Sequence, residues 1–218
     1  MALKMAYLFW HSHNESQRTV VLSFAHGYHG PSFGSLGINA TTSCHDAFRE
    51  IAPTTEHIPF PHTWLDDHHV EKKEDIAYDR LSDYLEKNAH YVSALIVEPL
   101  LQSFGGMHVC RPTFLTRVIQ LVQSYGILTI MDERFTALLR CGTLFAHQHL
   151  AIDPDMIVLG SSLTNGATPF GVTTVSKRLQ QALDPQLSNP LFLQEHGYQI
   201  PPTAASAALA TLSSIQTE

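Results

Sequence analysis

The sequence predicts an α/β fold with a mostly parallel sheet flanked by helices, and three observations support this. First, a short apolar run at 92–97, a helical pattern over 112–125 and a second apolar run at 127–131 form a βαβ unit, whose strands are parallel. Second, both runs are bounded by Gly, Pro or charge, as is typical of strands buried on both faces. Third, Glu98 and Asp132 directly follow the two runs, so we expect both at the sheet edge where ligands bind.

Length and charge narrow the class of protein. The 218 residues are enough for one large domain or two small ones. The net charge of -7 argues against a broad nucleic-acid-binding surface. No apolar run is long enough to span a membrane, and the apolar N-terminal stretch is too short for a signal peptide. Cys44, Cys110 and Cys141 form no CxxC pair, which favours a reducing compartment, so we expect a cytoplasmic location.

The fourteen histidines predict no metal site. None of them lies in an HExxH motif or in a Cys/His zinc spacing. We interpret them as scattered surface and polar core residues.

The first part of the chain is expected to hold one helix and one strand. Apolar residues recur at helical spacing over 1–10, and 18–24 is typical of a strand. A glycine-rich turn segment over 25–37 follows, where glycines let the backbone approach a ligand closely. The prolines of 41–69 predict irregular structure.

The central part is expected to alternate helices and strands. A helix is predicted over 75–88, with Ile76, Leu81 and Leu85 on its inner face. The next helix begins at Pro112 and ends before Gly126, which suits the preferences of helix termini. The later elements are a linker over 142–149, strands over 155–160 and 172–175, helices over 176–183 and 204–215, and a loop over most of 184–202.

Six runs of this chain, taken together, resemble the class III aminotransferases, which use pyridoxal phosphate (PLP). The runs are LKMAYLFW, GYHGPSFGSLG, VEPLLQSFGGM, DERFTALLRCGTLFA, PDMIVLGSSLTNG and HGYQIPPTAASAALATL, in the order and spacing of the family. Within the family the chain resembles the diaminopelargonate transaminases of the biotin pathway. The resemblance implies the large PLP-binding domain of the aspartate-aminotransferase class (fold type I). It also implies a small-molecule amino donor and acceptor, and a homodimer or a heterodimer with a related aminotransferase.

The resemblance also implies roles for particular residues. Asp132 matches the carboxylate beside the ring nitrogen of PLP, which must stay protonated for the cofactor to accept electrons. Tyr28 matches the aromatic residue that covers one ring face and lies near the substrate. The remaining matches are Glu98 and Gln102 in supporting roles, Tyr198 and Gln199 at the cofactor phosphate, and Gly197 near the substrate.

The most important departure from the family is Ser161. The family has a lysine after the strand at 155–160, in the run LGK, and this chain has Leu159-Gly160-Ser161. A serine has no amine, so it cannot form the Schiff base with the cofactor or move the proton that the lysine carries. Lys177 lies beyond the next strand and is not expected to substitute. We therefore predict impaired catalysis, with no competent catalytic residue.

Other departures from the family also predict impaired catalysis. Within 1–218 we expect no counterpart of the phosphate-binding loop that precedes the first helix in the family, or of the small domain with its substrate-binding arginine. We therefore interpret 1–218 as a partial large domain. The family pattern HG-x-T is replaced by His196-Gly197-Tyr198-Gln199. Arg134 stands where the family has an apolar residue, and we expect its guanidinium to neutralise Asp132 and weaken its hold on the ring nitrogen.

Two functions follow from these observations. The first is a class III aminotransferase-like protein whose own catalysis is impaired by Ser161. The alternative is a non-catalytic remnant, or a binding or dimerisation partner of a full-length aminotransferase.

Overall fold

The fold is built on one six-stranded sheet. The computed structural model describes residues 1–39, 52–187 and 200–216. The strands are β1 (Val20–Phe24), β2 (Thr55–Ile58), β3 (Val92–Val97), β6 (Leu128–Asp132), β7 (Met156–Leu159) and β8 (Val172–Val175). Their order is β2-β1-β3-β6-β7-β8, and only the β7–β8 pair of this sheet is antiparallel. The predicted mostly parallel α/β sheet is therefore confirmed.

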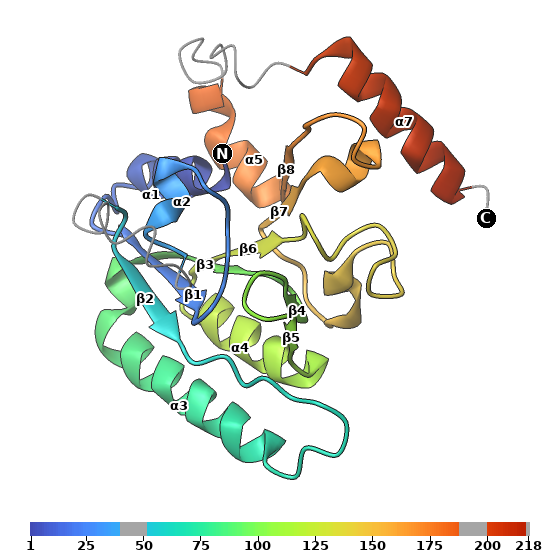
Figure 1. Ribbon diagram of the computed structural model, residues 1–218. Helices are drawn as coiled ribbons and strands as arrows, with labels where there is room; N and C mark the ends of the chain where they lie inside the picture. Colours follow the sequence, from blue (N-terminus) through green and yellow to red (C-terminus); the bar gives the residue numbers. More distant parts are fainter. Residues whose placement is uncertain (40–51, 188–199, 217–218) are drawn as a thin grey trace.

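Helices cover both faces of the sheet (Figure 1). The helices are α1 (Ala2–Ser12), α2 (Phe33–Leu36), α3 (Val70–Asn88), α4 (Pro112–Ser124), α5 (Lys177–Leu187) and α7 (Pro202–Gln216). The 3₁₀ turns are η2 (Ala89–Tyr91), η3 (Ala146–His149) and η4 (Ser161–Thr164), and a small antiparallel pair joins β4 (Leu101–Gln102) to β5 (His108–Val109). Figure 1 shows α3 and α4 below the sheet and α1 and α5 above it.

The core consists of two apolar layers with the sheet between them. All six residues of β3 are buried, as are all five of β6, because helices lie on both sides of these strands. Phe114, Leu115 and Val118 of α4 lie in one layer. Phe9 and Trp10 of α1 lie in the other, together with Leu179 of α5. The sheet is thus held rigidly, and the ends of β3, β6 and β7 are fixed relative to one another.

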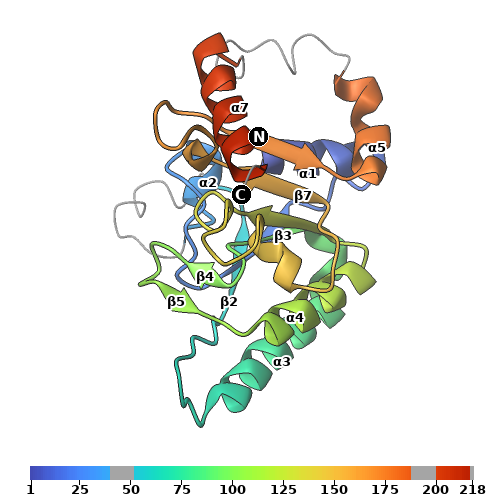
Figure 2. The same ribbon diagram turned by 90° about the vertical axis from the view of Figure 1, so that its right-hand side faces the viewer.

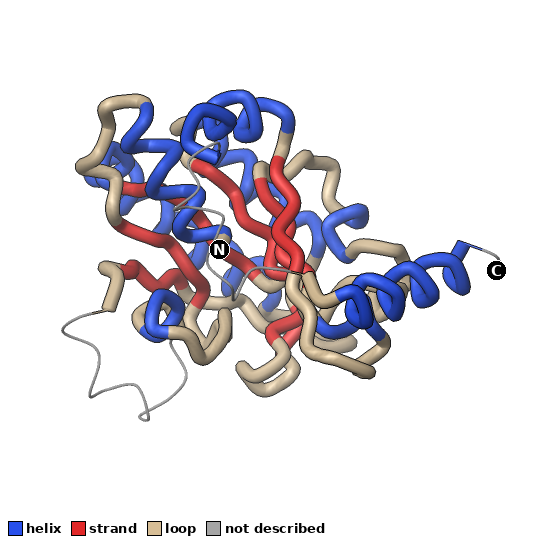
Figure 3. Tube along the Cα trace, turned by 90° about the horizontal axis from the view of Figure 1, so that it is seen from above, coloured by secondary structure: helices blue, strands red, loops and turns tan. Residues whose placement is uncertain are grey.

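Helix α7 lies apart from these two layers. It projects from the body of the molecule in Figures 1 and 3, and Figure 2 shows the molecule from the side toward which α7 extends. Ala208 of α7 belongs to a small third cluster with Leu159 and Leu163. The helix is therefore anchored beside η4, the turn that follows β7.

Three parts of the fold differ from the sequence prediction. Ile76 is 55% exposed, and the buried residues of α3 are Glu74, Ala77, Leu81 and Leu85. Its helix begins at Val70 rather than at 75, and the buried stripe includes a glutamate, so the apolar pattern alone misplaced the inner face. The segment predicted as irregular contains β2, an edge strand whose first three residues are only partly buried and therefore give a weak apolar pattern. The loop predicted from residue 184 is also helical as far as Leu187.

Candidate active site

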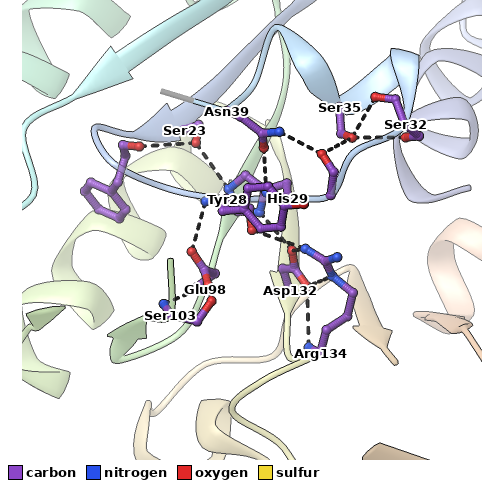
Figure 4. Close-up of polar contacts among 12 residues, drawn as sticks. Ser23, Tyr28, His29, Ser32, Ser35, Asn39, Glu98, Ser103, Asp132 and Arg134 are labelled. Carbon is purple, nitrogen blue, oxygen red and sulfur yellow. Dashed lines mark hydrogen bonds and ion pairs between the residues drawn. The ribbon is translucent and has the colours of Figure 1, made fainter. Parts of the chain in front are cut away.

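The candidate site lies at the carboxyl ends of three adjacent parallel strands. Val97 of β3 is paired in register with Met131 of β6, and Asp132 is paired with Val158 of β7. Glu98 therefore follows β3 at the edge where β6 ends in Asp132. The prediction that these two carboxylates share one edge of the sheet is confirmed (Figure 4).

The carboxylate of Asp132 is bound by two basic side chains. Arg134 Nε donates to Asp132 Oδ1 and Arg134 Nη2 donates to Oδ2, both at 2.8 Å. His29 Nδ1 lies 2.9 Å from Oδ2, and because an ionised carboxylate only accepts, Nδ1 carries the proton. Burial works to raise the pKa of Asp132, but the hydrogen bonds from His29 and Arg134 outweigh it and lower the pKa to about 2. Asp132 is therefore ionised near neutral pH.

The loop after β1 is held over this carboxylate by hydrogen bonds at several points (Figure 4). The Tyr28 N–H donates to Glu98 Oε2 at 3.1 Å, and Glu98 Oε1 accepts from the Ser103 N–H at 3.0 Å. The His29 N–H donates to Asn39 Oδ1 at 2.6 Å. Glu98 thus supports the loop. The parts played by Asn39 and Ser103 were missed, because nothing in the local sequence marks these long-range partners.

Tyr28 lies beside the site, with its ring against Phe104. The ring centroids of Tyr28 and Phe104 are 4.4 Å apart, and its carbonyl accepts from Arg134 Nη2 at 3.2 Å. The guanidinium carbon of Arg134 lies 5.9 Å from the centroid of the Tyr28 ring. The prediction that the Tyr28 ring covers one face of the cofactor ring is not tested by these contacts and stays a prediction.

Gln102 is buried beside the same loop. Its Nε2 donates to the carbonyl of Ala25 at 2.9 Å. Its Oε1 is buried and has no hydrogen-bond partner among residues 1–39, 52–187 and 200–216. The supporting role assigned to it stays a prediction. The predicted site residues Gly197, Tyr198 and Gln199 lie outside the described residues.

An open cavity of about 1790 Å³ adjoins Arg134. Its walls come from the start of α1, the end of β7 with η4, strand β8 and helix α7, and they include Ser161 and Ser162. No lysine is present among the described residues that line it. Lys177, at the start of α5, is not a lining residue. Ser161 thus lies on the cavity wall just after β7, and no lysine within the described wall replaces it. Its match to the family's Schiff-base lysine stays a prediction.

Comparison with known proteins shows the family to which this chain belongs. The family model described as aminotransferase class-III matches residues 1–218. This chain belongs to the class III aminotransferase family. The predicted family and its fold type I architecture are confirmed.

Two relatives by sequence are adenosylmethionine-8-amino-7-oxononanoate aminotransferases. That of Synechococcus elongatus is 35% identical over 212 residues, 97% of this chain and 49% of the relative. That of Helicobacter pylori is 30% identical over 223 residues, 100% of this chain and 49% of the relative. This class III chain therefore spans about half the length of the curated relatives it matches.

Solved transaminase structures share its fold. An (S)-enantioselective omega-transaminase from Thermomicrobium roseum aligns with a TM-score of 0.89 at 26% identity, covering 99% of this chain and 48% of that one. An amine transaminase from an uncultivated Pseudomonas species, solved in its PLP-bound form, aligns with a TM-score of 0.87 at 27% identity, covering 99% and 50%.

Two further findings concern membrane-spanning helices and metal sites. No helix within the described residues is both long and apolar enough to cross a membrane. In that same part of the chain, no group of three or more His, Cys, Asp or Glu residues is arranged to hold a metal ion.

Proposed function

We propose that this chain is a PLP-type aminotransferase domain, related to the biotin-pathway diaminopelargonate transaminase, whose own catalysis is impaired at Ser161. The observation that carries the proposal is the cavity beside the Asp132 site, whose described wall contains Ser161 and no lysine. Transamination of this type needs an amine that holds the cofactor and moves a proton. A serine hydroxyl supplies neither function.

The residues present do not fit a covalently held cofactor. PLP acts as an electron sink when it is bound. Asp132 is the carboxylate for its ring nitrogen by family position, but both carboxylate oxygens already accept hydrogen bonds within the chain. The tethering amine is replaced by Ser161. We therefore assign no catalytic step to this site, and small-molecule amino donors and acceptors are substrates of the family rather than of this chain alone.

The test is covalent capture of PLP. The unaltered chain, Ser161→Lys and the matched control Ser162→Lys would be incubated with saturating PLP, reduced with borohydride and mapped by peptide mass spectrometry. We expect a near-stoichiometric adduct at position 161 of Ser161→Lys, and only scattered surface labelling in the other two. A stoichiometric adduct on one lysine of the unaltered chain, together with transamination, would overturn the proposal.

We propose as a second candidate that the chain pairs with a related full-length aminotransferase. Aromatic rings exposed beside the site favour this function. Phe104 is 59% exposed, and its ring centroid lies 5.3 Å from that of Phe135. Large exposed apolar groups gathered at one place are typical of protein interfaces.

Co-expression with a full-length class III aminotransferase tests the second candidate. We expect a mixed complex in sedimentation velocity that Phe104→Ser weakens. Ile76→Ser is the matched control, because Ile76 is exposed to a similar degree but lies on α3. Failure to form any mixed complex contradicts this candidate.

A further inference from the structure

We propose that Arg134 is a built-in occupant of the position where the ring nitrogen of PLP would meet Asp132. Its guanidinium takes the place of the protonated ring nitrogen, so a ring can bind only by displacing this side chain. The inference rests on the proposed function, because it concerns the same site. Arg134 would thus hinder cofactor binding independently of the missing lysine at position 161.

The first argument is that Asp132 has no acceptor position left. A carboxylate offers about four lone-pair positions, two on each oxygen. Oδ1 accepts from Arg134 Nε at 2.8 Å and lies 3.4 Å from the backbone N–H of Arg134. Oδ2 accepts from Arg134 Nη2 at 2.8 Å and from His29 Nδ1 at 2.9 Å. A ring N–H therefore has to compete with donors that are already in place.

The second argument is that the guanidinium is held on several sides. Its Nη2 also donates to the Tyr28 carbonyl at 3.2 Å. Gly30 and Gly160 leave room for it, because a Cβ at Gly30 would lie 3.4 Å from Arg134 Nη1 and one at Gly160 would lie 3.1 Å from Arg134 Cγ. The stem of Arg134 thus passes over the residue just before Ser161. It runs beside the point from which a lysine would reach the cofactor.

The third argument is chemical. A guanidinium and a protonated pyridine are both planar cations that donate N–H groups in their plane, and a guanidinium binds a carboxylate through two parallel bonds. Asp132 is buried and needs a cation to remain ionised without a large desolvation cost. Arg134 supplies that cation from within the chain. The acceptor positions of Asp132 are therefore filled without a cofactor. When the amine alone is restored, PLP still has to compete with Arg134 for Asp132, so it binds more weakly but still forms the adduct at saturating concentration.

The experiment measures PLP affinity in chains that carry the restored amine. Ser161→Lys would be compared with Ser161→Lys/Arg134→Val by absorbance titration with PLP, followed by borohydride reduction and peptide mapping. Ser161→Lys/Arg140→Val is the matched control, because Arg140 lines the same cavity and is exposed. Breaking a bidentate charged pair corresponds to a change in affinity on the order of ten- to a hundredfold.

The expected result is that Arg134→Val tightens PLP binding by that factor, whereas Arg140→Val changes it little. Equal affinity of Ser161→Lys and Ser161→Lys/Arg134→Val overturns this inference and leaves the proposed function standing. The absence of a reduced adduct at position 161 in every chain overturns both. Circular dichroism checks folding, and if the Val variant fails to fold, Arg134→Lys takes its place. Lysine lacks the two-pronged fork, so it should also tighten binding, and no change with lysine overturns the inference.

Discussion

The guanidinium of Arg134 meets the carboxylate of Asp132 through two parallel hydrogen bonds, each 2.8 Å long. The two residues are two positions apart, where β6 ends. Asp132 is the last residue of β6 and Arg134 lies in the turn that follows, so the turn places the guanidinium beside the carboxylate. The contact that the sequence predicted between Arg134 and Asp132 is present, and its effect on cofactor binding stays a prediction.

The acid sensitivity of the fold should depend on Asp132. Its pKa in the folded chain, about 2, lies below the ordinary value of 3.8, because the hydrogen bonds from His29 and Arg134 outweigh the effect of burial. A lowered folded pKa stabilises the fold above the unfolded value, and this contribution is lost as the pH falls through about 2. As the pH falls from 3.8 to about 2, we expect the free energy of unfolding of the unaltered chain to fall by about 2 kcal/mol.

Asp132→Asn should lack that part of the acid dependence. Urea unfolding at a series of pH values measures it, with Asp75→Asn, an exposed aspartate, as control. Asp132→Asn should also be less stable at neutral pH, because it leaves the Arg134 guanidinium without its anion. An Asp132→Asn chain with the same acid dependence as the unaltered chain would contradict the assignment.

The ion pair between the partly exposed Arg111 and the buried Glu74 should contribute to stability. Arg111 Nε and Nη2 lie 2.7 and 2.6 Å from the two Glu74 oxygens, and the Glu74 side chain is 3% exposed. Arg111→Met leaves a buried carboxylate without a cation, so we expect a loss of about 3 kcal/mol in urea unfolding. The exposed pair of Arg117 and Asp75 is the control, and Arg117→Met should cost less than about 1 kcal/mol. Similar losses for both variants would contradict the prediction that the Arg111–Glu74 pair contributes more to stability than the exposed pair.

The inner face of α3 can be tested by two truncations. Leu81 is fully buried in the core, so Leu81→Ala should lower the free energy of unfolding by about 3 kcal/mol. Ile76 is exposed, so Ile76→Ala should change it by less than about 0.5 kcal/mol. Thermal melts with calorimetry distinguish the two. A large effect of Ile76→Ala would favour the face predicted from the sequence over the observed one.

The cysteines should differ in reactivity. Burial raises the pKa of the Cys110 thiol to about 12, and Cys110 is 6% exposed. Burial also raises the pKa of Cys141, which is only partly buried. Because the thiolate is the reactive form, alkylation mapped by mass spectrometry should label Cys141 well before Cys110 in the folded chain. Both should react quickly in denaturant, and early labelling of Cys110 without denaturant would show that its surroundings open.

The sequence by itself determined the family, the βαβ unit and the edge where the carboxylates lie. These features depend on local patterns: apolar runs at 92–97 and 127–131, a helix between them, and charged residues that follow each run. The six matching runs also pointed to Asp132 and Ser161, whose roles toward the cofactor stay predictions. Local periodicity is sufficient for such features, because each is encoded within a few consecutive residues.

Only the tertiary structure decided what surrounds Asp132. His29 lies 103 positions away in sequence, and Gly30 and Gly160 are brought to opposite parts of Arg134 by strands that are distant in the chain. The predictions about Ile76 and about the segment that contains β2 were wrong for a related reason. Burial depends on which neighbours the sheet and helices bring together. A sequence lists the side chains, but the free energy of a buried carboxylate depends on the donors that the folded chain places within 3 Å or so of it.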